Sequence, residues 1–314
     1  MRVKTRQNSE VLKMQNTIGK LFEMYLLTLV SERNCSETTI TSYKTDYNQF
    51  LAFCRKSKQS FSINQINTLF LRAYINHLKF GKSFKTNTIR RKIHSLSSFF
   101  TFCQENEIIE KNPMLPIKAP KEEKILPVYL NEKDLKKLID TPKKYSRFES
   151  HINRDTAMIA VLAFTGIRRN ELLNLNWTDV DFAAKLITVR KGKENKDRKV
   201  PIIPPLDLYL WNYLQDRLPM TNPAMFISDK GNRLSTSNYH VIFKRYVRKA
   251  GLSDNISSHK IRHTFATLMY QNGVDIRSIQ ELLGHEDLNT TSIYTHTNLN
   301  HLKNEVEKHP LFSR

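Results

Sequence analysis

The stretch SSHKIRHTFAT, residues 257–267, places a histidine and an arginine on one face of a predicted helix. His259 and Arg262 are three positions apart, so their side chains lie about one turn apart on that face. Ile261 and Phe265 supply apolar positions through which such a helix packs. Because a cationic pair next to a packed face needs an anion to meet it, this stretch predicts an anion-binding site.

The charge of the chain indicates a partner with many negative charges. Its 314 residues include 50 Lys and Arg against 30 Asp and Glu, a formal net charge of +20. A field of this sign attracts polyanions, most often nucleic acid, and an anionic membrane surface is the alternative. The sequence shows no segment apolar enough to span a bilayer, so we expect a nucleic-acid partner and no membrane.

The cysteines and the start of the chain bear on its compartment. Cys35, Cys54 and Cys103 form no CxxC pair, which predicts free thiols in a reducing compartment and argues against a zinc site. The first residues are basic and lack the apolar run of a secretory signal. We therefore expect a bacterial or archaeal cytoplasmic protein that associates with the nucleoid.

Residues 15–108 are predicted to form a helical domain. Apolar residues recur at helical spacing over four segments, 17–31, 36–56, 65–80 and 86–104. No strand pattern interrupts them, so the segments predict a small helical bundle.

Residues 109–127 are predicted to link this domain to the next. Four of the eleven prolines lie within 105–127, which disfavours a helix and favours an extended connection. A loop inserted within a single domain is the alternative.

Residues 128–314 are predicted to form a second domain of mixed structure. Alternating apolar residues on both sides of KGKENKD predict a β-hairpin over 185–203 with a lysine-rich tip. The other segments are predicted to be helical: 131–140, 154–166, 170–181, 206–217, 235–250, 258–272, 275–283, 287–296 and 298–308. The fold class is therefore mainly α with a small β-sheet.

The second domain contains the residues for phosphoryl transfer without a metal. TGIRRNELLNL, 165–175, begins a helix at Arg168, and ELLGHEDLNTTSIYTH, 281–296, contains His285 and Tyr294. A tyrosine hydroxyl can attack a phosphodiester, arginines can stabilise the charge that develops, and a lysine or histidine can protonate the leaving oxygen. The sequence has no P-loop, GxGxxG or paired carboxylates, so we expect neither a metal nor another cofactor. The anion that His259 and Arg262 bind is then the scissile phosphate.

These motifs resemble those of the tyrosine recombinase (phage integrase) family, and within it the Xer-like simple recombinases. TGIRRNEL resembles the first arginine box, HKIRHTFAT the His-x-x-Arg box and LLGHEDLNTTSIYTH the last box. The resemblance implies a catalytic set and one supporting acid: Arg168, Lys193, His259, Arg262, His285 and the nucleophile Tyr294, supported by Glu171. The hairpin departs from the family's usual GKGNK, and aligning its NK selects Lys193. Lys191 and Lys196 stay as alternatives for the acid and as DNA contacts.

The resemblance also implies an architecture and a reaction. An N-terminal SAM-like core-binding domain and a mixed α/β catalytic domain would form a C-shaped clamp around duplex DNA. Strands would be cut and rejoined through a 3′-phosphotyrosyl intermediate and a Holliday junction, by a tetramer on paired half-sites, with a second recombinase or an accessory protein as further partners. Only about 15 residues precede the first predicted helix, so we expect no arm-binding domain and a role in integration, excision or dimer resolution.

A basic stretch of the first domain is predicted to contact the DNA backbone. GKSFKTNTIRRK, residues 81–92, carries five basic residues and no acid. They are Lys82, Lys85, Arg90, Arg91 and Lys92.

Two other functions remain open on the sequence. One is a DNA-binding protein without catalysis, which the full set of reactive residues opposes. The other is a type IB-like topoisomerase, which shares the phosphotyrosine chemistry but exchanges no strands between partners.

Overall fold

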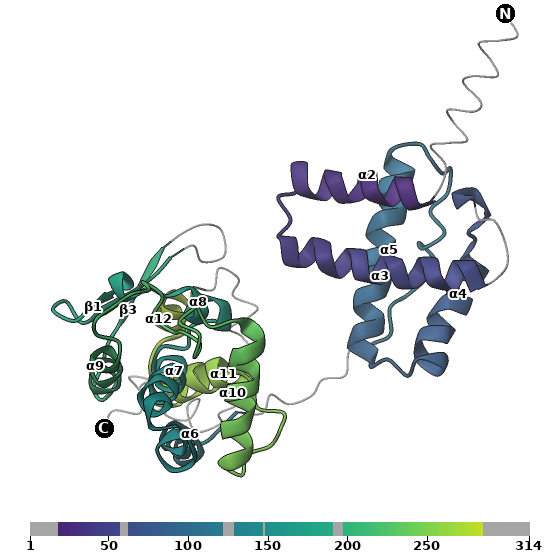
Figure 1. Ribbon diagram of the computed structural model, residues 1–314. Helices are drawn as coiled ribbons and strands as arrows, with labels where there is room; N and C mark the ends of the chain where they lie inside the picture. The colour runs from purple at the N-terminus through teal and green to yellow at the C-terminus, as the bar shows by residue number, and fades with distance from the viewer. Residues whose placement is uncertain (1–17, 57–61, 122–128, 147, 191–196, 285–314) are drawn as a thin grey trace, which may run out of the picture. The chain divides into compact units, whose positions relative to one another are not determined.

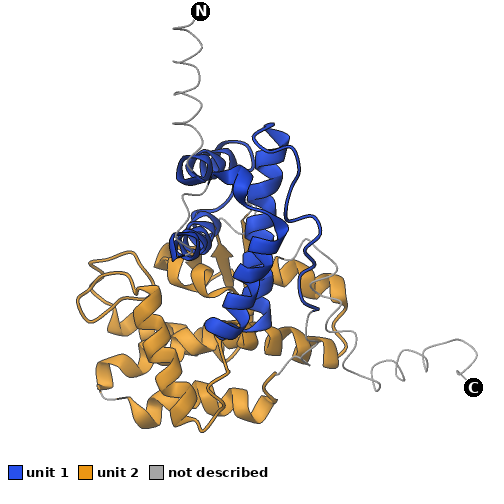
Figure 2. Ribbon diagram, turned by 90° about the vertical axis from the view of Figure 1, so that its right-hand side faces the viewer, with its two compact units in different colours: residues 1–126 blue, residues 127–314 orange. Residues whose placement is uncertain are grey.

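The computed structural model describes residues 18–56, 62–121, 129–146, 148–190 and 197–284. The chain divides into two compact units, residues 1–126 and 127–314, which Figure 2 shows in two colours. We describe each unit by itself. The predicted helices 287–296 and 298–308 lie outside the described residues.

Unit 1 is the predicted helical bundle. Its α-helices are α2 (Ile18–Ser31), α3 (Glu37–Lys56), α4 (Thr68–Asn76) and α5 (Thr86–Glu105), with a short 3₁₀ helix, η1 (Ile63–Gln65), and a π-helical segment that continues α4, η2 (His77–Gly81) (Figure 1). An aromatic core joins them, and Phe22 of α2 stacks on Tyr47 of α3 with ring centroids 3.6 Å apart. The helix predicted over 65–80 begins later, at Thr68, because Asn67 caps that start by accepting a hydrogen bond from Phe70 N at 2.9 Å.

Residues 109–121 pack on unit 1 and are not a free connection. Ile109 and Met114 are buried in the core of the bundle. Thr68 Oγ1 donates to the carbonyl of Pro113 at 2.9 Å, and Arg90 donates to the carbonyl of Pro120. The first part of the predicted linker 109–127 therefore belongs to the bundle, because its apolar side chains find a place in the core.

Unit 2 combines helices with one small sheet (Figure 1). In chain order its elements are α6 (Glu132–Tyr145), η3 (Glu149–His151), α7 (Ile152–Thr165), α8 (Arg169–Asn174), η4 (Trp177–Asp179), β1 (Val180–Asp181), β2 (Leu186–Val189), β3 (Arg198–Pro201), α9 (Leu206–Asp216), α10 (Thr236–Lys249), α11 (Ser258–Gln271) and α12 (Ile276–Leu283). The fold class predicted from the sequence is confirmed.

Helix α7 lies in the middle of unit 2. It packs against α6, α9 and α11, and its residues from Arg154 to Ala163 are all buried (Figure 1). Two polar partners meet the buried carboxylate of Asp155: Arg154 Nε donates to it at 2.8 Å and Tyr246 Oη at 2.7 Å. A charge at the centre of the core is therefore paired, as burial requires.

The sheet has the order β1-β2-β3 with antiparallel pairs. Ile187 lies opposite Val200, and Val189 opposite Arg198, so the hairpin predicted over 185–203 is present. The helix predicted over 170–181 is wrong in its second half. It ends at Asn174, and the chain continues through η4 into β1, with Asp179 accepting from Asn176 N at 2.8 Å.

Two further sequence predictions can be compared with the described residues. None of the helices in these ranges is long and apolar enough to cross a membrane. The three cysteines are free, and burial raises the pKa of the Cys54 and Cys103 thiols to about 12. Both thiols are therefore unreactive parts of the core.

Candidate functional site

Arg168 begins α8 directly after a tight turn. Gly166 ends α7 with φ +61°, where a Cβ atom would lie 2.6 Å from Phe265 Cδ1 and 2.7 Å from Leu283 Cδ2. Glycine is therefore required both by the backbone angle and by the packing of α11 and α12 on this turn. The turn places Arg168 between the ends of three helices.

Glu171 joins two arginines. Its carboxylate accepts from Arg168 N at 2.7 Å and from Arg168 Nη1 at 2.9 Å. It also accepts from Arg198 Nη1 at 3.0 Å and Nη2 at 2.7 Å, a bidentate pair. Burial alone would raise the pKa of this carboxyl, but these hydrogen bonds and the Arg198 charge lower it to about 2. Glu171 is therefore ionised and holds both guanidinium groups in place.

Arg262 reaches the same place from α11. Its side chain is buried, and it donates from Nη1 to the carbonyl of Gly166 at 2.8 Å and from Nη2 to that of Leu283 at 2.7 Å. Ser257 begins α11 by accepting from the backbone, which fixes the helix that carries Arg262. The arginine is thus held by carbonyls of two other helix ends.

Three guanidinium groups meet the end of α12, and we call Arg168, Arg198 and Arg262 the arginine cluster. They donate to three successive carbonyls: Arg198 Nε to Leu282 at 3.1 Å, Arg262 Nη2 to Leu283 at 2.7 Å and Arg168 Nη2 to Gly284 at 3.2 Å. The last carbonyls of a helix lack partners within it and carry partial negative charge. The cluster therefore concentrates positive charge directly before residue 285.

His259 lies one turn before Arg262 on α11. Its side chain stays exposed at the surface, yet partial loss of water around the ring lowers its pKa. The positive charges of Arg262, Arg169 and Arg168 lower the pKa further. A neutral imidazole next to a cationic cluster can accept or pass on a proton at neutral pH.

The structure brings together Arg168, Glu171, His259 and Arg262, four of the residues predicted from the sequence. His285 and Tyr294, together with Lys191, Lys193 and Lys196, lie outside the described residues. Their neighbours are described: α12 ends at Gly284 with φ +64°, and β2 and β3 flank residues 191–196.

The basic stretch of unit 1 divides into exposed and bound side chains. Lys82 and Lys85 are exposed before α5. Arg91 is partly exposed and donates from Nη2 to Asp46 Oδ1 at 2.7 Å.

Lys92 corrects the predicted DNA surface. Its side chain is 2% exposed, and its ammonium donates to Asp46 at 2.6 Å and to Gln49 at 2.7 Å. It cannot contact DNA there, because it lies on the same face of α5 as the buried Ile89 and Leu96.

Sequence reasoning missed the role of Arg198. In the sequence Arg198 is only one of several basic residues in the hairpin, and it lies 27 positions from its partner Glu171. The strand pairing that places Arg198 at the start of β3 was predictable, but the approach of its side chain to α8 and α12 was not.

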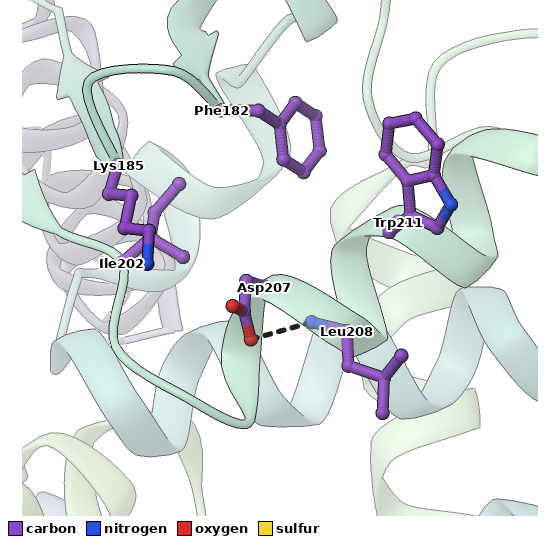
Figure 3. Close-up of a pocket in the computed structure, with 6 residues that line it drawn as sticks. All are labelled: Phe182, Lys185, Ile202, Asp207, Leu208 and Trp211. Carbon is purple, nitrogen blue, oxygen red and sulfur yellow. Dashed lines mark hydrogen bonds between the residues drawn. The ribbon is translucent and has the colours of Figure 1, made fainter.

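A hollow of about 310 Å³ on unit 2 is separate from this site (Figure 3). Phe182 and Lys185 line it from the β1–β2 connection, and Asp207 and Trp211 line it from α9. Asp207 accepts a hydrogen bond from Leu208 N at 2.8 Å, and the hollow shares no residue with the arginine cluster. Within the described ranges, no group of three or more His, Cys, Asp or Glu side chains could hold a metal ion.

Comparison with known proteins agrees with this geometry. The sequence profile of the phage integrase family matches residues 128–301, more than half of the chain. The chain belongs to the phage integrase family. The profile of the family's N-terminal SAM-like domain matches residues 22–106, so both units match parts of this one family.

Relatives of this family cover nearly the whole chain. Tyrosine recombinase XerC of Listeria innocua is 35% identical over 297 residues, 93% of this chain and 97% of the relative. Tyrosine recombinase XerC of Herpetosiphon aurantiacus is 36% identical over 279 residues, covering 87% and 89%. The chain is thus a family member with Xer-like relatives along its length.

Solved structures give the same result. The structure of XerA recombinase is 32% identical, covers 93% of this chain and 98% of its own, and has a TM-score of 0.52. A post-cleavage complex of the XerH site-specific recombinase with its palindromic difH substrate is 27% identical and has a TM-score of 0.70. It covers 88% of this chain and 81% of its own.

Glu171→Gln should destabilise unit 2 in a pH-dependent way. The carboxyl has a pKa of about 2 when folded, against an ordinary 4.5. Its stabilisation is therefore present above about pH 4.5 and is lost as the pH falls toward 2. A lowering of that size corresponds to about 3 kcal/mol at pH 7.

Urea unfolding at two pH values checks this expectation. The difference in unfolding free energy between the wild type and Glu171→Gln should shrink by about 1.5 kcal/mol between pH 7 and pH 3.5. Glu281→Gln, at an exposed position on α12, is the control and should change the stability at pH 7 by less than about 0.5 kcal/mol. A pH-independent difference for Glu171→Gln would contradict the assignment.

Proposed function

We propose that this chain is a site-specific DNA recombinase that cuts and rejoins strands through a covalent 3′-phosphotyrosyl intermediate. The observation that carries the proposal is the arginine cluster, where Arg168 and Arg262 meet beside His259 in a member of the phage integrase family. Forked guanidinium donors suit the non-bridging oxygens of a phosphodiester. The XerH complex with its difH substrate supports duplex DNA as the ligand.

The proposed reaction is an exchange of two P–O bonds. The hydroxyl oxygen of Tyr294 attacks the scissile phosphorus, and the bond from phosphorus to the 5′ oxygen breaks. His259 accepts the tyrosyl proton, which its lowered pKa favours because the ring is then neutral. Lys193 gives a proton to the departing 5′ oxygen. Arg168 and Arg262, with His285, stabilise the extra charge on the phosphate, and Glu171 keeps Arg168 oriented.

The proposed assembly is a tetramer that joins two DNA sites, each made of paired half-sites. Reversal of the first step by a 5′ hydroxyl from the partner duplex would give a Holliday junction and then recombinants. We further propose that the protein acts on DNA in the bacterial cytoplasm, at the nucleoid, as its bacterial relatives suggest. Integration, excision and dimer resolution all use this chemistry.

A suicide substrate tests the proposed chemistry. Half-sites are selected by the protein from a random-sequence duplex pool and built into a duplex with a nick beside the cleavage position. The nick releases the 5′ end, so we expect a covalent protein–DNA adduct that resists SDS. Binding without any adduct would identify a DNA-binding protein without catalysis.

A plasmid carrying two selected sites separates recombination from topoisomerase activity. We expect deletion or inversion between the sites, and no product from a plasmid with one site. Relaxation of a plasmid without a site, and no recombinants, would instead indicate a type IB-like topoisomerase.

Replacing Lys193 with alanine should slow cleavage of ordinary DNA and spare a substrate whose 5′-bridging oxygen is sulfur. A thiolate leaves without a proton, so the general acid is not needed there. We expect a loss of about 10²–10⁴-fold on the ordinary substrate and recovery to near the wild-type rate on the sulfur substrate. Single-turnover cleavage on both substrates measures it.

Lys191→Ala and Lys196→Ala are the matched variants for this test. If either is rescued by sulfur and Lys193→Ala is not, the general acid is the rescued lysine. If none is rescued, the acid lies outside residues 191–196, and His259 or His285 becomes the candidate.

Lys82 and Lys85 are proposed to contact DNA phosphates. Their double replacement by alanine should reduce the slope of log affinity against log salt by about 2, since each phosphate that the protein neutralises adds about 0.9 to the slope. Fluorescence titrations of a selected duplex at several salt concentrations measure the slope.

The double variant Lys20→Ala/Lys44→Ala removes the same charge from exposed positions on α2 and α3. An equal change of slope in both double variants would mean that only the overall charge matters, against a contact at residues 82 and 85. Arg90 and Arg91 stay proposed contacts, although each already donates within the unit.

A further inference from the structure

Arg198 differs from the other members of the arginine cluster in how its donors are used. All three guanidinium nitrogens donate within the protein: Nη1 and Nη2 to the Glu171 carboxylate, and Nε to the carbonyl of Leu282. The side chain is only 13% exposed. These bonds connect β3 to α8 and to the end of α12, three elements that are far apart in the sequence.

The stem of Arg198 also packs against the last residue of the α12 turn. A Cβ atom on Gly284 would lie 3.2 Å from Arg198 Cδ and 3.3 Å from its Nη1. Arg168 donates to the carbonyl of the same glycine at 3.2 Å. Two arginines that are both bound to Glu171 therefore contact Gly284, the residue that caps α12.

Arg198 also stands at the base of the β2–β3 hairpin, so its contacts with Glu171 and the end of α12 affect the hairpin too. Arg198 is the first residue of β3 and pairs with Val189, the last residue of β2. Its guanidinium therefore fixes the base of the hairpin, at the first residue of β3, to Glu171 and the end of α12.

We propose that Arg198 is a positioning residue for strand cleavage, which holds the base of the β2–β3 hairpin and the end of α12 in register with Arg168 through Glu171. This inference rests on the proposed function. Without Arg198, Glu171 keeps only Arg168, the Leu282 carbonyl loses a donor, and the hairpin base loses its attachment to α12. Two catalytic contributions then weaken together: the phosphate contact of Arg168 and the delivery of the hairpin lysine.

Arg190 offers a matched control at the other side of the same hairpin. Arg190 directly follows the last residue of β2, and its side chain forms an ion pair with the carboxylate of Asp179. However, it is 59% exposed and makes no contact with the arginine cluster among the bonds described. Arg190→Ala removes one guanidinium and one ion pair from the hairpin but keeps the bonds of Arg198 to Glu171 and Leu282.

The experiment compares Arg198→Ala, Arg198→Lys and Arg190→Ala in the full chain. DNA affinity, melting temperature and single-turnover cleavage are measured with suicide substrates that carry oxygen or sulfur at the 5′-bridging position. We expect Arg198→Ala to lose about 10²-fold in cleavage rate on the oxygen substrate, with affinity within about threefold. We expect the sulfur substrate to recover the part of the loss that comes from poor delivery of the general acid. The part that comes from a weakened phosphate contact of Arg168 should remain.

Arg198→Lys keeps the charge but lacks the forked donors of a guanidinium. We therefore expect a cleavage rate between those of the wild type and Arg198→Ala, and a sulfur-to-oxygen rate ratio raised above that of the wild type, as in Arg198→Ala. Arg190→Ala should match the wild type in both rates. A purely structural role for Arg198 would leave the ratio of the cleavage rates on the sulfur and oxygen substrates unchanged. If Arg198→Ala does not fold, Arg198→Lys supplies this ratio.

Three outcomes would overturn the inference. They are a cleavage rate like that of Arg190→Ala, a sulfur-to-oxygen ratio equal to that of the wild type, and a loss of affinity as large as the loss of rate, which would make Arg198 a direct phosphate contact. Failure of the proposed function is distinguishable, because the wild type would then form no covalent adduct on either substrate.

Discussion

Tyr294→Phe should abolish the covalent protein–DNA adduct and leave DNA affinity within about twofold of the wild type. The substitution removes one oxygen, the proposed nucleophile, and keeps the ring. Loss of a nucleophile costs about 10⁴-fold or more in rate, since no remaining group can form the intermediate. Adduct formation on the nicked substrate, followed by peptide mapping, measures the effect.

Two buried tyrosines of unit 2, Tyr239 and Tyr246, are poor substitutes for this hydroxyl. Burial raises the pKa of Tyr246 to about 12, and its hydroxyl is bound to Asp155. Tyr239 is buried in the core as well.

Tyr145→Phe is the matched control, because Tyr145 is 46% exposed on α6 and loses only a surface hydroxyl. It should form adduct at the wild-type rate. An adduct that persists in Tyr294→Phe and maps to another residue would refute the assignment.

Helical periodicity predicted most of the described elements because most of the helices bury one face in the core of their own unit. The pattern failed over 170–181, where apolar residues keep helical spacing past the true end at Asn174. There Trp177 packs against Tyr213 from α9, with ring centroids 5.5 Å apart, and Asp179 accepts from Asn176 N. These tertiary contacts decide the backbone, and spacing along one segment contains no information about them.

Lys92 shows a limit of reading charge from composition. The five basic residues of 81–92 appeared as one surface, but α5 turns Lys92 inward with Ile89 and Leu96. Its partner Asp46 lies on α3, 46 positions away, and is itself 1% exposed. The helical period places Lys92 on the buried face, but only the three-dimensional pairing explains why a charge is tolerated there.

The candidate site was predictable as far as local motifs define it. His259 and Arg262 share a helix face by spacing alone, and Arg168 and Glu171 are three positions apart at a helix start. The convergence of these pairs, and the part of Arg198, depend on α8, α11, α12 and β3 meeting at one point. Only the resemblance to a family anticipated that the two pairs converge, and nothing in the sequence anticipated the contacts of Arg198.

Arg262→Lys should reduce the cleavage rate by about 10²–10³-fold, the scale of losing one preorganised donor at a developing charge. Arg262 uses Nη1 on Gly166 and Nη2 on Leu283, and these two bonds fix the direction of its planar fork of donors. An ammonium is a single point charge, so it cannot hold two helix ends and a phosphate together. Affinity should change by less than about fivefold, because many other phosphate contacts remain.

Arg217→Lys separates this catalytic role from the cost of altering a buried arginine. Arg217 is also buried in unit 2 and also donates to carbonyls, to Asn222 at 2.8 Å and Ala224 at 3.1 Å, but it lies outside the arginine cluster. We expect both variants to melt at lower temperature and only Arg262→Lys to cleave slowly below that temperature. Equal cleavage rates in the two variants would mean that Arg262 serves the fold alone, since a residue that binds the scissile phosphate must affect the rate beyond its effect on stability.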